Sequence, residues 1–369
     1  MKNFNYWDDL YRNEKLEEFN RDNVGLLWLK IKSLIRVELV KGFLKFSGYT
    51  ATAKKQVDNF RELFKLLSQD IVQSHSLLND YIRKVSHVQI TSIDIQQLVS
   101  ELYKLKNFDW GGDYRNSLDK YLVRKYVKVL NPSYDDLVSK FETEINPVVQ
   151  GYVLNSWYNY WSSIVIENIF KLHPAVLPTV GQIKNVDFFI NDIPFDLKVT
   201  YLPSEYVKCK RKEKGLPIEL TYLKKKAAEA GIVFDKNAKP TDILYEITEK
   251  MKDKNDVFCS QVLTKLKAEK LEILKEVQEK PKILIKWLYE NQGEMRFGSE
   301  NRLFLILVDT DDFNNSWKLK RNINLLKPAV ISYLDSFKSK KTEDLNISFE
   351  FNGRSHGFSA LADIIFVVK

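Results

Sequence analysis

The stretch Lys184–Pro203, with the sequence KNVDFFINDIPFDLKVTYLP, contains two apolar runs separated by an Asn-Asp dipeptide at positions 191 and 192. Asn and Asp tolerate the positive φ that a two-residue hairpin turn requires, so the stretch predicts two antiparallel strands. Counting outward from this turn places Asp187 opposite Asp196. Because side chains alternate along a strand, Lys198 shares the face of Asp196. The hairpin therefore predicts one patch with two carboxylates and one ammonium.

The chemistry of this patch favours a metal ion. Two aspartates that face each other across a strand pair repel, so they need a compensating cation. Carboxylate oxygens suit Mg²⁺, and a neighbouring lysine can orient or help to deprotonate a water that attacks phosphorus. The alternative is a solvated hairpin in which Lys198 forms a cross-strand ion pair with Asp187 and Asp196, worth about 0.5 kcal/mol.

The pattern resembles the PD-(D/E)xK nuclease superfamily, whose signature is a carboxylate on one strand and (D/E)-x-K on the next. The matching residues are Asp187 and the Asp-Leu-Lys tripeptide at 196–198, although valine stands where the nominal motif has proline. The family also tends to place a glutamate on the helix before the hairpin, and Glu167 fits that position; the alternative is an exposed helix glutamate. The resemblance implies Mg²⁺ held by the two aspartates and Glu167, with the lysine at the attacking water.

Apolar spacing outside the hairpin predicts the rest of the fold. Residues 1 to about 150 repeat apolar positions at intervals near 3.6, which indicates helices. Residues 205–290 are rich in lysine and lack strand patterns, which indicates a helical insertion. A helix is expected over Trp317–Phe337. Strands are predicted at Val186–Ile190, Phe195–Tyr201, Leu303–Thr310, Ile347–Phe351 and Ile364–Val368.

These segments, together with the resemblance, predict an α/β chain with three parts. Residues 151–204 and 291–369 are expected to form a restriction-endonuclease-like core with a mixed central sheet. Residues 1–150 are expected to form an all-helical domain with a role in DNA recognition or dimerisation. The insertion at 205–290 contains Leu220–Leu244, which is similar to helix-extended-helix modules related to SAP domains; a plain helical hairpin has the same pattern.

The net charge favours a polyanionic partner, since the chain has 57 Lys and Arg residues but 49 Asp and Glu residues, which gives +8. A basic cluster at Lys208, Lys210, Arg211 and Lys212 follows the hairpin and predicts contacts with a phosphate backbone, although a solvated lysine-rich surface has the same pattern. Arg354 is expected to bind a phosphate or the edge of a guanine base; the alternative is a loop arginine without a binding role.

Composition excludes several other classes. Two cysteines are too few for a disulfide framework. No G-x-x-x-x-G-K-[ST] motif occurs, so no Walker-type ATP motor is expected. The N-terminal residues do not resemble a signal peptide, and the longest uncharged run is too polar for a bilayer. We expect a soluble cytoplasmic protein without ATP or a membrane partner.

The function expected from the resemblance is a Mg²⁺-dependent endonuclease that acts on double-stranded DNA, most like a type II restriction enzyme. A homodimer that cuts both strands of a symmetric site is the usual arrangement. One alternative is a repair, recombination or phage-defence nuclease with the same core. Another is a DNA-binding protein whose nuclease-like core is catalytically inert.

Overall fold

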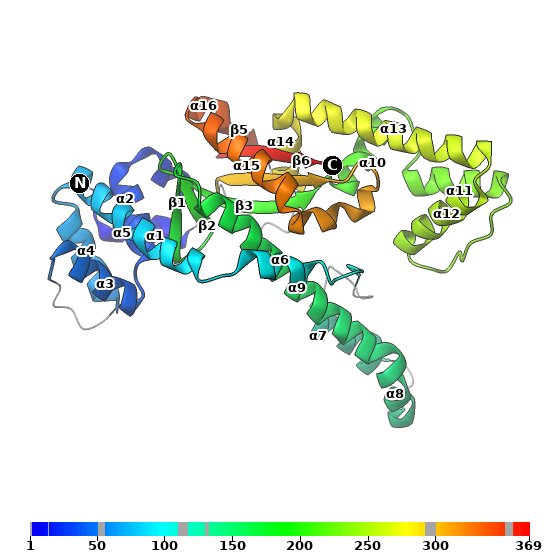
Figure 1. Ribbon diagram of the computed structural model, residues 1–369, viewed down its shortest axis with the longest axis horizontal. Coiled ribbons are helices and arrows are strands. Elements are labelled where there is room, and N and C mark those ends of the chain that lie inside the picture. The colour runs from blue at the N-terminus through cyan, green and yellow to red at the C-terminus, as the bar shows by residue number, and fades with distance from the viewer. Residues whose placement is uncertain are drawn as a thin grey trace. The chain divides into compact units, whose positions relative to one another are not determined.

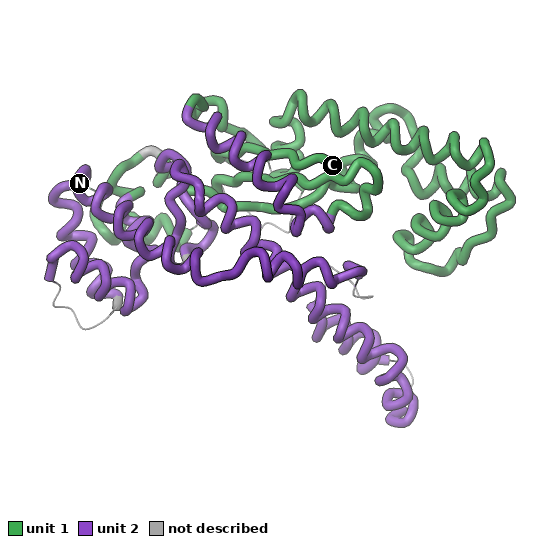
Figure 2. Tube along the Cα trace, in the orientation of Figure 1, with its two compact units in different colours: residues 1–26, 194–316, 339–369 green, residues 27–193, 317–338 purple. Residues whose placement is uncertain are grey.

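The computed structural model describes residues 2–13, 15–50, 56–109, 117–129, 133–291, 300–350 and 357–369. The chain is a mixed α/β protein (Figure 1). It divides into two compact units, which Figure 2 shows in different colours. The first unit comprises residues 1–26, 194–316 and 339–369, and the second comprises residues 27–193 and 317–338.

The first unit contains strands from the second half of the chain and most of the predicted insertion. Its elements are α1 (Phe4–Arg12), η1 (Leu16–Arg21), β3 (Ile193–Tyr201, from Pro194), α10 (Ser204–Glu213), α11 (Glu219–Glu229), α12 (Pro240–Lys254), α13 (Val257–Glu279), α14 (Pro281–Asn291), β4 (Arg302–Val308), α16 (Thr342–Leu345), β5 (Asn346–Phe349) and β6 (Phe358–Val368). α2 (Asn23–Ser33) and η4 (Phe313–Arg321) begin in this unit and end in the second.

The sheet of the first unit is mixed, as the sequence predicts. β3 runs parallel to β4 with Asp196 beside Arg302, and β4 runs parallel to β6 with Arg302 beside Ala362. β5 is antiparallel to β6. All residues of β4 are buried, which is typical of a central strand in a parallel sheet and explains its continuous apolar sequence.

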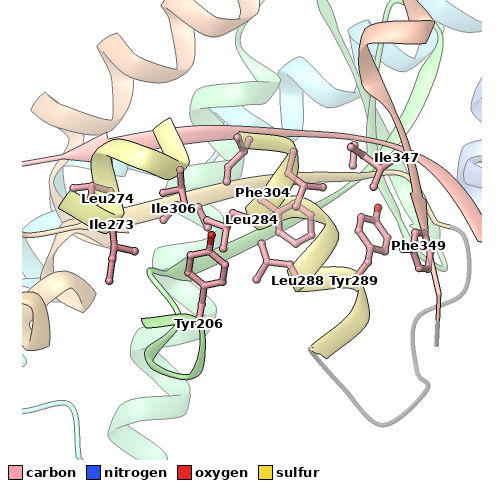
Figure 3. Close-up of a cluster of buried hydrophobic side chains, with 14 of the residues drawn as sticks. Tyr206, Ile273, Leu274, Leu284, Leu288, Tyr289, Phe304, Ile306, Ile347 and Phe349 are labelled. Carbon is pink, nitrogen blue, oxygen red and sulfur yellow. The ribbon is translucent and has the colours of Figure 1, made fainter. Parts of the chain in front are cut away.

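One face of this sheet is covered by α10, α13 and α14 (Figure 3). Phe304 and Ile306 of β4 pack against apolar residues of these helices. Tyr289 of α14 stacks on Phe349 of β5 with ring centroids 4.5 Å apart. Because Asp196 pairs directly with Arg302, its side chain lies on this same face, at the start of the apolar core.

The regular elements of the predicted insertion are all helices, from α10 to α14. α11, α12 and the first half of α13 have a small core of their own, which includes Leu223, Ile247 and Val262. α11 and α12 are joined by residues 230–239 without helix or strand, so the segment 220–244 has the helix-link-helix order that the sequence predicts.

The second unit is mainly helical and contains one hairpin. Its elements are α3 (Val37–Ser47), α4 (Gln56–Leu67), α5 (Ile71–Thr91), α6 (Ile95–Leu102), α7 (Leu118–Leu122), η2 (Val123–Val127), α8 (Tyr134–Lys140), η3 (Phe141–Ile145), α9 (Asn146–Lys171), β1 (Val176–Ile183), β2 (Val186–Ile190) and α15 (Ile323–Phe337).

Within the second unit the hairpin of β1 and β2 packs against α5 and α9. Arg83 of α5 donates to the carbonyl oxygens of Val176 and Pro174 at 3.1 and 3.0 Å. Phe170 of α9 stacks on Phe188 of β2 with centroids 5.1 Å apart. These contacts fix β2, which carries Asp187, to the end of the long helix α9.

The predicted elements are largely observed. Up to residue 150, the described residues form helices and no strand, and each predicted strand overlaps an observed one. The predicted helix at 317–337 is wrong in its first turn, because η4 ends at Arg321 and Asn322 caps α15 by accepting from the Leu325 amide. No strand was predicted at β1. Within the described residues, no helix has the length and apolarity needed to cross a bilayer.

Candidate active site

Asp196 and Lys198 lie together on β3, as the sequence predicts. The Lys198 ammonium donates to Oδ1 of Asp196 at 2.9 Å and lies 2.8 Å from Oδ2. Asp196 is only 6% exposed, whereas the Lys198 side chain is 43% exposed. The pair therefore joins the buried core to the surface, with the carboxylate inside and the ammonium reaching solvent.

Sequence reasoning missed a second ion pair beside Asp196. Nη2 of Arg302 donates to Oε2 of Glu300 at 3.1 Å, and its Nε lies 3.6 Å from Oδ2 of Asp196. Glu300 is 1% exposed and Arg302 3%. Burying a charge is costly unless it is paired, so the two acids and two bases compensate one another. The signal was present as charged residues directly before the apolar run of β4.

Tyr289 supports this cluster from α14. The Arg302 guanidinium lies 5.0 Å from the centroid of its ring, and its hydroxyl donates to the Glu300 carbonyl oxygen at 2.7 Å. Burial raises the pKa of the Tyr289 hydroxyl above its usual value. The tyrosine therefore stays a neutral hydrogen-bond donor over the whole range in which the protein is expected to act.

Asn301 fixes the backbone at the start of β3. Its carbonyl oxygen accepts from the Asp196 amide at 3.0 Å, and its Nδ2 donates to the Pro194 carbonyl oxygen at 2.9 Å. Its Oδ1 accepts from the Leu361 amide of β6 at 3.0 Å, and its amide group pairs reciprocally with that of Asn20. One buried side chain thus ties β3, β4, β6 and the N-terminal segment together around Asp196.

Asp187 and Glu167 belong to the second unit. Asp187 lies on β2, is half-buried, and its carbonyl oxygen accepts from the Thr179 hydroxyl at 2.9 Å. Glu167 lies on α9 and forms an ion pair with Lys171, one turn away, at 2.6 Å. A shared metal site of Asp187, Asp196 and Glu167 stays a prediction. In the part of the chain that the structure describes, no group of three or more His, Cys, Asp or Glu residues could hold a metal ion.

The turn after β2 has the conformation that the sequence predicts. Asn191 and Asp192 have φ angles of 50° and 63°. Asp192 accepts a 2.6 Å hydrogen bond from Lys30 of α2, whose side chain is fully buried and lies 3.0 Å from Nδ1 of His75. Burial lowers the pKa of Lys30, and the charge of Asp192 opposes that shift. A buried cation therefore anchors the turn to a helix of the same unit.

Most of the predicted phosphate-binding cluster on α10 is held in ion pairs. Lys208 pairs with Glu205 at 2.6 Å, and Lys210 pairs with Glu276 of α13 at 2.8 Å. The hydrogen bond to Glu276 raises the pKa of Lys210.

Arg211 differs from its neighbours because it is buried. It bonds Glu269 of α13 and the Pro217 carbonyl oxygen, and burial lowers its pKa. Lys212 is exposed. Arg354 lies outside the described residues. Within this fold, Arg211 attaches α10 to α13, and Lys208 and Lys212 are the members of the cluster that face solvent.

The residues present fit a cation in one respect. The Asp196 carboxylate carries hard oxygen atoms of the kind that bind Mg²⁺. Its present partners are the Lys198 ammonium and the nearby Arg302 guanidinium, so a metal ion would have to compete with them for these oxygen atoms. Comparison with known protein families, with curated proteins and with solved structures gave no match for this chain.

Proposed function

We propose that the protein is a Mg²⁺-dependent endonuclease that hydrolyses phosphodiester bonds of double-stranded DNA, most like a type II restriction enzyme. The observation that carries the proposal is the Asp196–Lys198 pair, in which a buried carboxylate and a half-exposed ammonium share one face of β3. The resemblance of residues 187–198 to the PD-(D/E)xK signature supports the same reaction.

Each residue has a separate role in this proposal. Asp196 would hold the cation together with Asp187, and Glu167 would complete or tune the metal shell. When bound, Mg²⁺ stabilises negative charge on the phosphoryl group. Lys198 reaches solvent beside the carboxylate, where its ammonium can orient the attacking water and offset the charge that develops near it.

Contacts with DNA are proposed for the basic side chains of α10 that face solvent, although Lys208 also pairs with Glu205. Lys212 is exposed on α10, and Lys208 lies one turn earlier on that helix. The helix-link-helix segment of α11 and α12 is a second proposed contact, by its similarity to modules related to SAP domains. Arg354 is a third, and a homodimer would bring two such sets of contacts to a symmetric site.

A second candidate function is favoured by the contact between Asp196 and Arg302. A carboxylate with two basic partners is also what a purely structural ion-pair network requires. A DNA-binding protein with an inert nuclease-like core would have this arrangement. A structure-specific repair, recombination or phage-defence nuclease would share the active pair but choose its substrate differently.

One experiment separates these functions. The purified protein is incubated with Mg²⁺ and with plasmid, phage and branched DNA, and all new ends are mapped. Ends at one recurrent duplex sequence support the restriction enzyme, and ends at junctions or flaps support the structure-specific nuclease. Retained duplex binding without cutting of any DNA supports the inert protein and contradicts the nuclease.

A further inference from the structure

The first half of helix α9, in the second unit, has two different sides. On one side, Val148, Val149 and Tyr152 form a small core with residues of α7, η2, α8 and η3, which lie along this part of the helix (Figure 1). Val148 and Val149 lie four and three positions before Tyr152, so the three side chains share one side of α9. The opposite side of the helix therefore faces away from this core.

A stripe of apolar residues runs along this opposite side. Its members are spaced by three and four positions and so lie above one another on the helix: Val153, Leu154, Trp157, Tyr160 and Trp161. Val153, Leu154 and Tyr160 are 57%, 43% and 61% exposed, and the two tryptophans are half-buried. Contiguous exposed apolar side chains are typical of interaction surfaces, and Tyr and Trp are enriched where such surfaces bind most strongly. The stripe therefore has the composition of a protein–protein contact.

The charge of this surface favours a second copy of the chain as its partner. From Ile145 to Ile166 the sequence contains no Asp, Glu, Lys, Arg or His. The chain as a whole has a net charge of +8, so two copies repel each other on average. A contact through the stripe avoids this repulsion, because neither copy contributes a charge to it. A charged partner, in contrast, would find no complementary charge on this side of α9.

The order of side-chain sizes along the stripe fits an antiparallel pair of helices. The smaller residues Val153 and Leu154 precede Trp157, and the larger residues Tyr160 and Trp161 follow it. In an antiparallel pair centred on Trp157, Leu154 of one copy lies opposite Tyr160 of the other. Val153 then lies opposite Trp161. Small side chains meet large ones at each of these positions, which allows close packing, whereas a parallel pair would place large residues against large ones.

We propose that two copies of this protein associate through the exposed stripe of α9, with the two helices antiparallel and Trp157 at the two-fold axis. Each copy then contributes the same residues to the contact, as a symmetric dimer requires. A single helix pair is at the small end of interface sizes, below about 1,200 Å², so we expect a reversible dimer with a dissociation constant in the micromolar range. This association does not depend on the proposed nuclease function.

The test measures the mass of the full-length protein by sedimentation over the micromolar range, without DNA or metal. We expect the wild type to change from monomer to dimer as its concentration rises. Leu154→Glu and Tyr160→Lys should each raise the dissociation constant at least about tenfold, because each buries an unpaired charge in the contact. An equimolar mixture of the two variants should dimerise again, because the carboxylate introduced in one copy then lies opposite the ammonium introduced in the other.

The matched control is Val72→Glu, because Val72 of α5 is an apolar helix residue that is 83% exposed but lies outside the stripe. It should dimerise as the wild type does. Leu154 and Tyr160 are exposed, so their variants should fold, and circular dichroism checks this. Three results would overturn the proposal: a wild type that stays monomeric throughout the range, dimerisation of Leu154→Glu with the wild-type constant, or a mixture of the two variants that does not dimerise.

Discussion

Asp196 and Lys198 form an ion pair in which one ammonium lies within 2.9 Å of both carboxylate oxygens. The two residues lie two positions apart on β3, so both side chains are on the same face of the sheet. The ammonium occupies the open side of a carboxylate whose inner side faces Arg302. A metal ion that binds Asp196 must therefore compete with Lys198 for the same oxygen atoms.

This competition predicts the effect of removing the lysine on metal affinity. Lys198→Met should bind Mg²⁺ roughly three- to tenfold more tightly than the wild type, because it removes a positive charge beside the ion. It should also abolish DNA cutting. Calorimetric titration with Mg²⁺ measures the affinity, and Lys340→Met, which removes the partner of Asp363 on β6, is the control. Equal or weaker Mg²⁺ binding by Lys198→Met would contradict the competition.

The buried pair of Glu300 and Arg302 should be strongly coupled. Arg302→Met removes a cation from beside two buried acids and should lower the free energy of unfolding by about 3–5 kcal/mol. Glu300→Gln should relieve part of this loss in the double variant, because the buried acid no longer needs a cation. Urea denaturation of the two single variants and the double variant measures the coupling. Additive losses would show that the two residues act independently.

Lys320 predicts a pH dependence of stability. Burial lowers its pKa to about 8, and its ammonium donates to Oδ1 of Asn159 at 2.9 Å. Above pH 8 the folded protein releases this proton, whereas the unfolded chain keeps it until its ordinary pKa of 10.5. The unfolded state then binds more protons, so the free energy of unfolding rises with pH in this window.

The measurement compares the wild type with Lys320→Met by urea denaturation at several pH values. Between about pH 7 and pH 9.5 the stability of the wild type should rise relative to the variant by about 2 kcal/mol. Groups other than Lys320 titrate alike in both proteins, so their contributions cancel in the difference between the two free energies of unfolding. A constant difference between the two proteins across this range would mean that Lys320 titrates normally.

The ion pairs of α10 predict different effects for neighbouring basic residues. Arg211→Met should lower the free energy of unfolding by about 3 kcal/mol, because it leaves Glu269 without its partner in a mostly buried site. Lys208→Met should change it by less than about 0.5 kcal/mol, since its pair with Glu205 is exposed. Thermal unfolding measures both. Similar losses in the two variants would contradict the distinction between buried and exposed pairs.

The hairpin turn and the ends of β2 could be predicted because they depend on local sequence. Asn191 and Asp192 accept positive φ, and the apolar run of β2 has the predicted bounds. β1 could not be predicted, because Pro178 and Gly181 indicate a turn. Gly181 is present for a different reason than a turn: a Cβ at this position would lie 2.2 Å from the Ser33 carbonyl oxygen. The close approach of α2 requires it, and this contact is not visible in the sequence.

The candidate site was predictable only in part for the same reason. Asp196 and Lys198 are two positions apart, so strand alternation alone brings them together. Arg302 reaches Asp196 only through the parallel pairing of β3 and β4, which are separated by the whole helical insertion. The ion pairs of α10 depend likewise on its packing against α13. Contacts between segments far apart in the sequence decide which charged side chains form ion pairs. The amino-acid composition does not reveal these contacts.

In the proposed function, the Asp196 carboxylate takes part in DNA cleavage and does not only stabilise the fold. The matched control is Asp363 of β6, which is also a buried aspartate with a lysine partner. Asp196 pairs with Arg302, and Arg302 pairs with Ala362. Asp363 is the residue after Ala362, so its side chain lies on the opposite face of the sheet. The direct measurement is the rate at which Asp196→Asn and Asp363→Asn cut duplex DNA at saturating Mg²⁺. We predict that Asp363→Asn cuts at the rate of the wild type and that Asp196→Asn, folded and still bound to DNA, does not cut. Equal cutting by the two variants, or no cutting by the wild type, would contradict the account.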